Sequence, residues 1–359
     1  MTLPEEATGP RGALVNEEPV PEALDHGTSD GTVEQKVAFG PLAADDHPPA
    51  DLVEPVESIP ARRALTTVAG PEALPTSPSQ LAAFGDRGAL RPVPGKVTSQ
   101  PGDLLAQVPD TAIEWMDRDG LAVRGVSVRG HVHRYEGSIR QDQLAMGQVG
   151  QAWVLAVADG LGSQAHSHLG AAIASRFISR SSSLEALLNS EEPIYSCAEV
   201  ASIMRHEAES RGLDPRSIST TLTFAVVDPR PVLDESGTPR WWIAVAQVGD
   251  SHAYLLRDGR WDLVTPTGQK DDLANVVDPL PRHTEAAVRY LEAGPGDVLA
   301  LTTDGVGNLL EDQSEFGAAL ASLWVDAAPS PAALLYVVDG SVKSYDDDRT
   351  FLAIRFGRV

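Results

Sequence analysis

Two Asp-Gly pairs in this sequence of 359 residues each follow directly on an apolar run. "WVLAVA" precedes Asp159 and Gly160, and "VLALTT" precedes Asp304 and Gly305. Carboxylates presented at the ends of two buried strands suit a hard divalent cation, because Mg²⁺ and Mn²⁺ prefer oxygen ligands. A glycine beside each carboxylate also allows a backbone carbonyl to approach such an ion closely. Together the two pairs indicate a metal site, although either pair alone is also typical of an ordinary turn.

The other four Asp-Gly pairs have no chemical role in our interpretation. The pair at 258–259 separates "HAYLL" from "RWDLV", two strand-like runs of similar length. This arrangement predicts a hairpin turn in which Gly259 supplies a positive φ. The remaining pairs, at 30, 119 and 339, lie in a proline-rich segment, at the start of a strand and at the end of a helix.

Two further acidic positions strengthen the case for a metal site. "IRQDQLAM" places Asp142 where a strand begins, and "SYDDDRTFLAI" places Asp346, Asp347 and Asp348 directly before the last strand. Such a cluster of like charges costs repulsion unless a positive charge lies nearby. Considered without the other positions, the cluster is equally well interpreted as a solvated acidic turn.

These carboxylates need strands and helices to hold them, and the hydrophobic pattern predicts both. Alternation or continuous apolar runs predict strands over 121–133, 142–148, 152–159, 218–228, 240–250, 251–265, 296–305 and 350–357. Helical spacing predicts helices over 167–180, in two stretches that continue to about residue 212, and around 315–326 and 330–341.

The order of these elements predicts the fold class. Along the chain we expect strands first, then helices, then many strands, then helices again and one final strand. This segregation of strands and helices favours α+β layers over a doubly wound parallel sheet. Continuous apolar strands suggest sheets that are covered on both faces. We therefore predict two largely antiparallel sheets packed together with helices outside them.

The composition divides the chain near residue 111. Residues 1–110 contain 16 of the 27 prolines, 17 acidic residues and only 7 basic residues. Such a segment buries too little apolar surface to offset its ordering entropy, so we predict that residues 1–111 are a largely disordered tail. The tail is either without a specific role or a docking or regulatory segment. The folded domain is predicted to span residues 112–359.

Charge and cysteine content exclude several classes of partner and site. A formal net charge of -23 argues against nucleic acid or an anionic membrane as a partner. The single cysteine, Cys197, permits no internal disulfide and disfavours a cysteine-based zinc site. No signal segment and no run of 18 apolar residues is visible, so we expect a cytoplasmic protein, and we expect a monomer.

The sequence resembles the type-2C protein phosphatases, a family of metal-dependent serine/threonine phosphatases, and in particular a bacterial branch of that family. Six motifs that occur in the order of the family carry the resemblance. The motifs are Gln141-Asp142, "VADGLGS", "STTL" (219–222), "VGDSHAYLL" (248–256), "TTDGV" (302–306) and "DDRTFLAI" (347–354). The resemblance covers about residues 120–357. It implies a four-layer α-β-β-α sandwich of two antiparallel sheets flanked by helices, which agrees with the order of the elements.

The resemblance also implies a role for each acidic position. Asp159 would bridge two ions, Mg²⁺ or Mn²⁺, with the Gly160 carbonyl as a further ligand. Asp304 and Asp347 would complete one metal site, since Asp347 lies three residues before Thr350 as in the family motif. Asp348 is a weaker candidate, because it lies where Asn is common in the family. Asp142 would support the second ion, in part through water. Asp250 would be a ligand of a third, looser ion.

The implied reaction is hydrolysis of phosphoserine or phosphothreonine in proteins, the products of a serine/threonine kinase. Water between the two ions would lose its proton near neutral pH and attack phosphorus in line. Two alternatives remain open: a pseudophosphatase that acts as a binding or signalling module, and a metal-dependent phosphoesterase for small molecules.

One departure from the family concerns the cation that binds the substrate phosphate. Many members carry an arginine four residues before the position of Asp142, and here that position is Ser138. Arg134, Arg140 or His133 are the candidate substitutes. The polar stretch 265–295 is either a mobile flap beside the site, as in bacterial members, or an ordinary surface loop.

Overall fold

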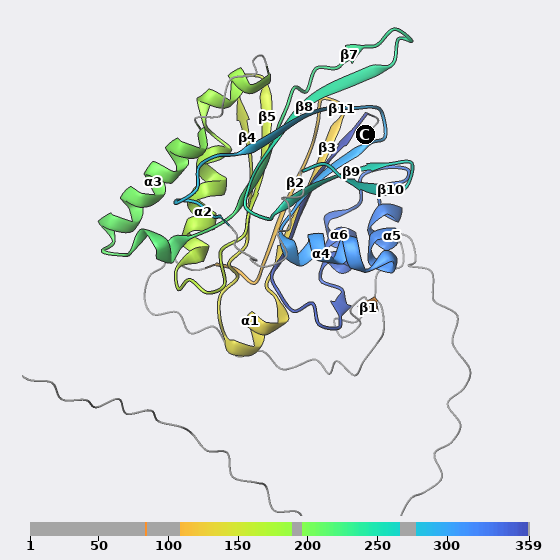
Figure 1. Ribbon diagram of the computed structural model, residues 1–359. Helices are drawn as coiled ribbons and strands as arrows, with labels where there is room; N and C mark the ends of the chain where they lie inside the picture. The colour runs from red at the N-terminus through yellow and green to blue at the C-terminus, as the bar shows by residue number, and fades with distance from the viewer. Residues whose placement is uncertain (1–82, 85–107, 189–195, 266–277, 358–359) are drawn as a thin grey trace, which may run out of the picture. The chain divides into compact units, whose positions relative to one another are not determined.

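The structure is a computed structural model, and it describes residues 83–84, 108–188, 196–265 and 278–357. All of them belong to one compact unit, Arg63–Val359. Within them, two antiparallel sheets lie face to face, and helices cover the outer face of each sheet (Figure 1). The fold is therefore the α+β sandwich of four layers that the order of the elements predicts.

The first sheet has the strand order β10-β9-β12-β14-β3-β2. Its strands are β2 (Thr111–Arg118), β3 (Leu121–Val128), β9 (His252–Arg257), β10 (Arg260–Leu263), β12 (Val298–Thr302) and β14 (Arg349–Phe356). Three of these strands, β3, β12 and β14, are buried along their whole length. One of their faces meets the second sheet and the other meets helices, so apolar residues are favoured at nearly every position.

The second sheet has the order β11-β8-β6-β5-β4, with β7 beside β8. Its strands are β4 (Gln143–Val149), β5 (Ala152–Ala158), β6 (Leu222–Val227), β7 (Val232–Leu233), β8 (Pro239–Val248) and β11 (Ala287–Ala293). Along β5, Trp153, Leu155 and Val157 belong to the core between the sheets. The alternate residues Val154 and Ala156 pack towards the helices instead, as the period of a strand requires.

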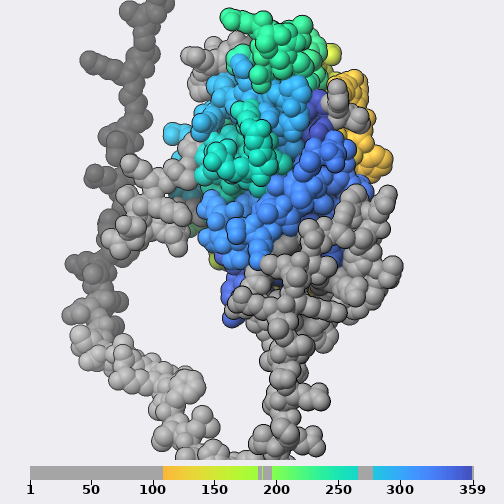
Figure 2. Space-filling model, turned by 90° about the vertical axis from the view of Figure 1, so that its right-hand side faces the viewer, coloured from red at the N-terminus to blue at the C-terminus, as the bar shows by residue number. Residues whose placement is uncertain are grey.

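The helices lie on the two outer faces. They are α1 (His131–Glu136), α2 (Ser167–Ile178), α3 (Ser196–Ser210), α4 (Asp304–Asp312), α5 (Ser314–Ser322) and α6 (Pro331–Val338), with short 3₁₀ segments η3 (Ser182–Leu188) and η4 (Pro215–Ile218). The helices α2 and α3 pack on the second sheet, and α4 to α6 pack on the first. In Figure 2 the latter group (blue) lies beside the β9–β10 hairpin (teal), where Trp261 Nε1 donates a hydrogen bond to the Gly317 carbonyl (3.1 Å).

Two of the Asp-Gly pairs form two-residue hairpin turns. Asp258 and Gly259 join β9 to β10 with φ angles of 52° and 77°, which confirms the predicted hairpin. Asp119 and Gly120 join β2 to β3 with φ angles of 56° and 75°. Positive φ at both positions is the conformation that matches the twist of the two strands. The pair at 119–120 is thus a hairpin turn, which the sequence analysis placed only at the start of a strand.

Several elements were not predicted from the sequence. The strand predicted over 121–133 ends at Val128, and the helix α1 begins at His131. The other unpredicted elements are β2, the helix α4 that begins at Asp304, the strand β11 at the end of the predicted flap or loop 265–295, the short β7 and η4, and a short parallel pair of β1 (Ala83–Phe84) with β13 (Ser341–Val342). The pairing of β1 means that two residues of the predicted tail are in regular structure.

The rest of that predicted tail up to residue 107 and residues 266–277 of the predicted flap lie outside the described residues. In the described part of the chain, no helix combines the length and the apolar character that crossing a membrane requires.

Candidate metal and phosphate site

Four of the five aspartates predicted as metal ligands line one small cavity of about 150 Å³, together with Gly160. Asp159 and Asp250 come from the ends of β5 and β8 in the second sheet, whereas Asp304 and Asp347 flank β12 and β14 in the first. The other residues that line it are Gln141, Gly160, Leu161, Gly162, Thr221 and Asp348. The structure therefore brings together carboxylates from four distant parts of the sequence, two from each sheet.

The backbone of Asp159 is fixed by the segment that leads into β6. The Asp159 carbonyl accepts hydrogen bonds from the Thr221 amide (2.8 Å) and from the Thr220 hydroxyl (2.7 Å). The Asp159 amide donates to the Thr221 hydroxyl (3.0 Å). These contacts hold the end of β5 in place, so that Asp159 and the Gly160 that follows it border the cavity.

Asp304 is the first residue of α4 and lies against the acidic segment before β14. A side chain at Gly305 would place its Cβ 2.0 Å from the Asp348 carbonyl oxygen, so only glycine permits this close approach. Asp304 Oδ1 is buried and accepts no hydrogen bond from the described residues. Burial and the negative charge of Asp347 raise the pKa of Asp304 to about 6.

Asp347 and Asp348 are adjacent in sequence but point to different surroundings. Asp347 borders the cavity. The Asp348 side chain is only 2% exposed, and it accepts hydrogen bonds from the Gly130 amide (2.6 Å) and the Gln141 amide (2.6 Å). Its Oδ1 also lies 2.9 Å from His133 Nδ1. Asp348 therefore joins the segment 130–141 to the start of β14.

Asp142 is buried behind the cavity and is not among the residues that line it. Its Oδ2 accepts hydrogen bonds from the hydroxyls of Thr303 (2.6 Å) and Thr350 (2.8 Å). Burial, with the charge of Asp348, raises the pKa of Asp142 well above its ordinary value. The predicted role of Asp142 at a second ion, in part through water, stays a prediction.

The carboxylates that line the cavity repel one another. Burial raises the pKa of Asp159 well above its ordinary value, and the charges of Asp142, Asp304, Asp347 and Asp250 add to the effect. The pKa values of Asp250 and Asp347 are also raised, chiefly by burial. A site that holds several carboxylates in this state favours a cation.

The donor set of the cavity fits a hydrated divalent ion. Carboxylate and carbonyl oxygens are the ligands that Mg²⁺ and Mn²⁺ prefer, and Asp304 Oδ1 has no protein partner in the described part of the chain. In that part, no three His, Cys, Asp or Glu side chains converge closely enough to hold one ion by themselves. Mg²⁺ is usually bound through one or two carboxylates and keeps several waters, so two aspartates and a carbonyl suffice.

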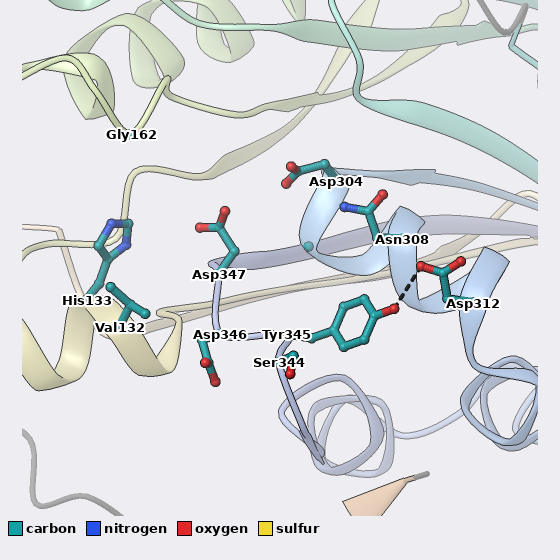
Figure 3. Close-up of a pocket in the computed structure, with 11 residues that line it drawn as sticks. Val132, His133, Gly162, Asp304, Asn308, Asp312, Ser344, Tyr345, Asp346 and Asp347 are labelled. Carbon is teal, nitrogen blue, oxygen red and sulfur yellow. Dashed lines mark hydrogen bonds between the residues drawn. The ribbon is translucent and has the colours of Figure 1, made fainter. Parts of the chain in front are cut away.

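A second, larger cavity of about 620 Å³ adjoins the first and shares Asp304, Asp347 and Gly162 with it. Figure 3 shows His133, Asp347 and Asp304 bordering the same open space, with Tyr345 further along the wall. The Tyr345 hydroxyl donates a hydrogen bond to Asp312 Oδ2 (2.7 Å). The volume of the larger cavity lies within the range of about 300–1,000 Å³ that is usual for ligand pockets.

Neither arginine predicted to bind phosphate lines these cavities. Arg140 is 1% exposed, and its Nη1 donates to the Ser127 carbonyl (2.6 Å). Arg134 forms ion pairs with Asp110 and Asp339, each at 3.0 Å. His133, the third candidate, does line the larger cavity.

Sequence reasoning missed the residues that support the ligands. The hydroxyls of Thr303 and Thr350 hold Asp142, and those of Thr220 and Thr221 hold Asp159. The repeated threonines in "TTDG" and "STTL" were the available signal, because short hydroxyl side chains at strand ends commonly bond to neighbouring backbone or carboxylates.

Comparison with known proteins identifies the family. The family model for protein phosphatase 2C matches residues 129–337, more than half of the chain. A search of curated proteins gave no match.

Similar solved structures include PppA, a key regulatory component of T6SS in Pseudomonas aeruginosa (21% identity, 66% of this chain and 97% of that chain, TM-score 0.46). They also include the Mycobacterium tuberculosis serine/threonine phosphatase PstP/Ppp (21% identity, 66% of this chain and 99% of that chain, TM-score 0.45). A third is RsbX in complex with magnesium (14% identity, 68% of this chain and 99% of that chain, TM-score 0.41). On the match to the family model, the chain belongs to the protein phosphatase 2C family.

Proposed function

We propose that the protein hydrolyses phosphoserine and phosphothreonine in other proteins, the products of a serine/threonine kinase, with bound Mg²⁺ or Mn²⁺. The observation that carries the proposal is the meeting of Asp159, Asp250, Asp304 and Asp347 in one cavity, each with a raised pKa. Membership of the family supports phosphatase activity.

Each acidic residue has a place in the proposed site. Asp159 would be a ligand of both ions, and the Gly160 carbonyl would be a further ligand. Asp304 and Asp347 would complete the site of one ion, while Asp142 would support the other ion, in part through water. Asp250, which lines the cavity from the end of β8, would hold a third and looser ion.

The chain's own groups prepare the reaction by fixing geometry. When bound, the two ions would lower the pKa of a water between them and offset charge on the phosphoryl oxygens. The hydrogen bonds to the Asp159 backbone and to the Asp142 carboxylate keep the ligands in position before substrate arrives. Cys197 is buried and its thiol pKa is raised to about 12, so this thiol is not a nucleophile for a covalent route.

The direct test is hydrolysis of a phosphothreonine peptide and of p-nitrophenyl phosphate, each with Mn²⁺ and with EDTA. We expect the protein to release phosphate from the peptide with Mn²⁺ and to lose this activity in EDTA. Asp159→Asn is the matched inactive control, because it changes one oxygen of the central ligand and little of the shape.

Each other outcome points to a different function. Hydrolysis of neither compound would favour a binding module, and hydrolysis of the small ester alone would favour a small-molecule phosphoesterase. Equal activity with Mn²⁺ and with EDTA would contradict the proposed metal dependence.

A further inference from the structure

The two cavities are strongly acidic, yet the proposed substrate carries a phosphate dianion. Among the described residues that line the two cavities there is no Lys or Arg, and His133 is the side chain that carries a positive charge when protonated. Metal ions neutralise part of the carboxylate charge, but a phosphoryl group is usually also held by a hydrogen-bond donor of the protein. His133 is placed to be that donor.

Asp348 fixes the orientation of the His133 ring. A buried carboxylate beside Nδ1 at 2.9 Å accepts the Nδ1–H bond, which leaves the Nε2 side of the ring free to face another group. The His133 side chain is 14% exposed and lines the larger cavity with Asp347 and Asp304 (Figure 3). The imidazole is therefore held at the wall of the cavity rather than free in solvent.

The helix that carries His133 is joined to the segment that carries Asp347. A side chain at Gly130 would place its Cβ 2.3 Å from the Asp347 carbonyl carbon, so the two backbones are in close contact. The Val132 amide donates a hydrogen bond to the Asp346 carbonyl (3.1 Å). The position of His133 is thus set relative to the proposed metal ligand, as a phosphate-binding group requires.

The two arginines are engaged elsewhere, in contrast to His133. Arg140 is almost fully buried, where it contacts the Ser127 carbonyl of β3, and Arg134 forms ion pairs with Asp110 and Asp339. Moving Arg140 to the cavity would leave a buried carbonyl without this partner, and moving Arg134 would break two ion pairs.

We infer that His133 is the residue that binds the phosphate of the substrate, and that Asp348 is the residue that positions it. This inference rests on the proposed function, since it assigns a group at the same site. The hydrogen bond to Asp348 also raises the pKa of His133, against the opposing effect of burial, and so favours the protonated ring that donates from both nitrogens.

The first experiment measures binding of inorganic phosphate to the Mg²⁺-saturated full-length protein by calorimetry. We expect His133→Ala and His133→Gln to weaken phosphate binding by about 10- to 100-fold, the usual range for a hydrogen bond to a charged group. His133→Arg should bind phosphate within about threefold of wild type, because the charge is kept. His131→Ala is the matched control, since it removes an imidazole from the same helix that lines neither cavity.

A second measurement separates positioning from a purely structural role of Asp348. Asp348→Asn alone should weaken phosphate binding and raise KM for the phosphopeptide more than it lowers kcat. The double variant Asp348→Asn with His133→Arg should recover phosphate binding, because arginine keeps its charge without the carboxylate. Failure of this recovery would overturn the role assigned to Asp348.

The outcomes distinguish this inference from the proposed function. Unchanged phosphate affinity in His133→Gln, with Mg²⁺ affinity also unchanged, would overturn the inference even if the wild type hydrolyses phosphopeptides. Lost phosphate affinity in His133→Gln would support it even if the wild type hydrolyses nothing. No phosphate binding by the wild type with Mg²⁺ would overturn it as well.

Discussion

Asp347 and Asp348 are adjacent in the chain, but their surroundings differ. Both residues line the small cavity, but Asp348 is buried and its oxygens accept hydrogen bonds from Gly130, Gln141 and His133. A carboxylate whose oxygens already accept three hydrogen bonds has little capacity left for a metal ion. The spacing to Thr350 and the hydrogen bonds therefore both assign the ligand role to Asp347.

We therefore expect Asp347→Asn to affect metal binding more than Asp348→Asn. Loss of one ligand should reduce both Mn²⁺ affinity and turnover on the order of 100-fold, because several kcal/mol of charge stabilisation are removed. Asp348→Asn should leave the number of Mn²⁺ ions bound unchanged. Calorimetric titration with Mn²⁺ and turnover of p-nitrophenyl phosphate compare the two variants, and equal losses of affinity would contradict the assignment.

The raised pKa of Asp304 predicts how the metal-free protein responds to pH. Its folded-state pKa of about 6 exceeds the ordinary value of 3.8. Proton binding by Asp304 therefore favours the folded state, so its contribution to stability is complete below 3.8 and is lost as the pH rises through about 6.

Thermal unfolding in EDTA at about pH 5 and about pH 7.5 measures this effect. The wild type should gain stability at the lower pH relative to Asp304→Asn, which carries a neutral side chain at both values. A difference between the two proteins that is the same at both pH values would contradict the prediction.

At the scale of elements, the buried strands were predictable, whereas two of the edge strands, β2 and β11, were not. β5, β12 and β14 are apolar along their length because both faces are covered, and such runs are visible in the sequence. β2 and β11 lie at sheet edges with many exposed residues, so their sequences lack a clear period.

The helix α4 illustrates a different limit of the sequence. "DGVGNLLED" contains two glycines in its first turn, which is typical of a turn rather than of a helix start. The glycine at 305 is required by the close contact with the Asp348 carbonyl, a contact that no local pattern reveals. The candidate ligands were predictable because strand ends can be found in sequence. The contacts of the supporting threonines, and the choice of His133 among three candidate cations, depend on tertiary packing.

We expect Gly305→Ala to be more damaging than its small size suggests. The added Cβ would lie 2.0 Å from the Asp348 carbonyl oxygen, so α4 and Asp304 must shift. Overpacking of this kind costs about 1–3 kcal/mol of stability, and Mn²⁺ affinity should fall with it. Gly317→Ala in α5 is the control, since its nearest atoms lie 3.9 Å away and alanine favours a helix by about 0.5–1 kcal/mol. Urea unfolding that ranks the two variants equally would refute this reading of α4.

For the whole molecule, the apolar core explains which part of the chain should fold by itself. The core consists of three clusters of buried apolar residues, one between the sheets and one beneath each helical layer. The buried residues of all three clusters lie between Leu121 and Phe356. Asp110 forms ion pairs with Arg129 (2.7 Å) and Arg134 (3.0 Å), so the ordered contacts extend slightly beyond β2.

A chain that begins at Val108 should therefore keep the stability of the full chain. We expect its thermal midpoint to lie within about 2 °C of the full-length value, with unchanged turnover of a small ester, because the short β1–β13 pairing is the one strand pairing lost among the described residues. A chain that begins at Ala112 loses the Asp110 ion pairs and the first residue of β2, so it should unfold at a lower temperature. A large drop for the longer of the two chains would show that residues before Val108 stabilise the domain.

The carboxylates also connect the two halves of the sandwich. Asp159 and Asp250 follow strands of the second sheet, while Asp304 and Asp347 belong to segments that flank strands of the first. An ion bound by ligands from both sheets would add a link across the interface between them, in addition to the apolar core. Because such an ion binds the folded state and not the separated strands, it stabilises the whole molecule by an amount that grows with the logarithm of its affinity.

We expect saturating Mn²⁺ to raise the thermal midpoint, with a gain in stability of about 2.7 kcal/mol when the ion is present at 100 times its Kd. Asp159→Asn and Asp347→Asn remove ligands from different sheets, yet both should lose most of this gain, since either change leaves the ion attached to one side only. Asp278→Asn changes a carboxylate that lines neither cavity and should keep the full gain. The comparison requires thermal unfolding of all four proteins in EDTA and in Mn²⁺. If Asp159→Asn abolished the gain while Asp347→Asn retained it completely, the ion would be held by the second sheet alone, and the proposed link between the sheets would be wrong.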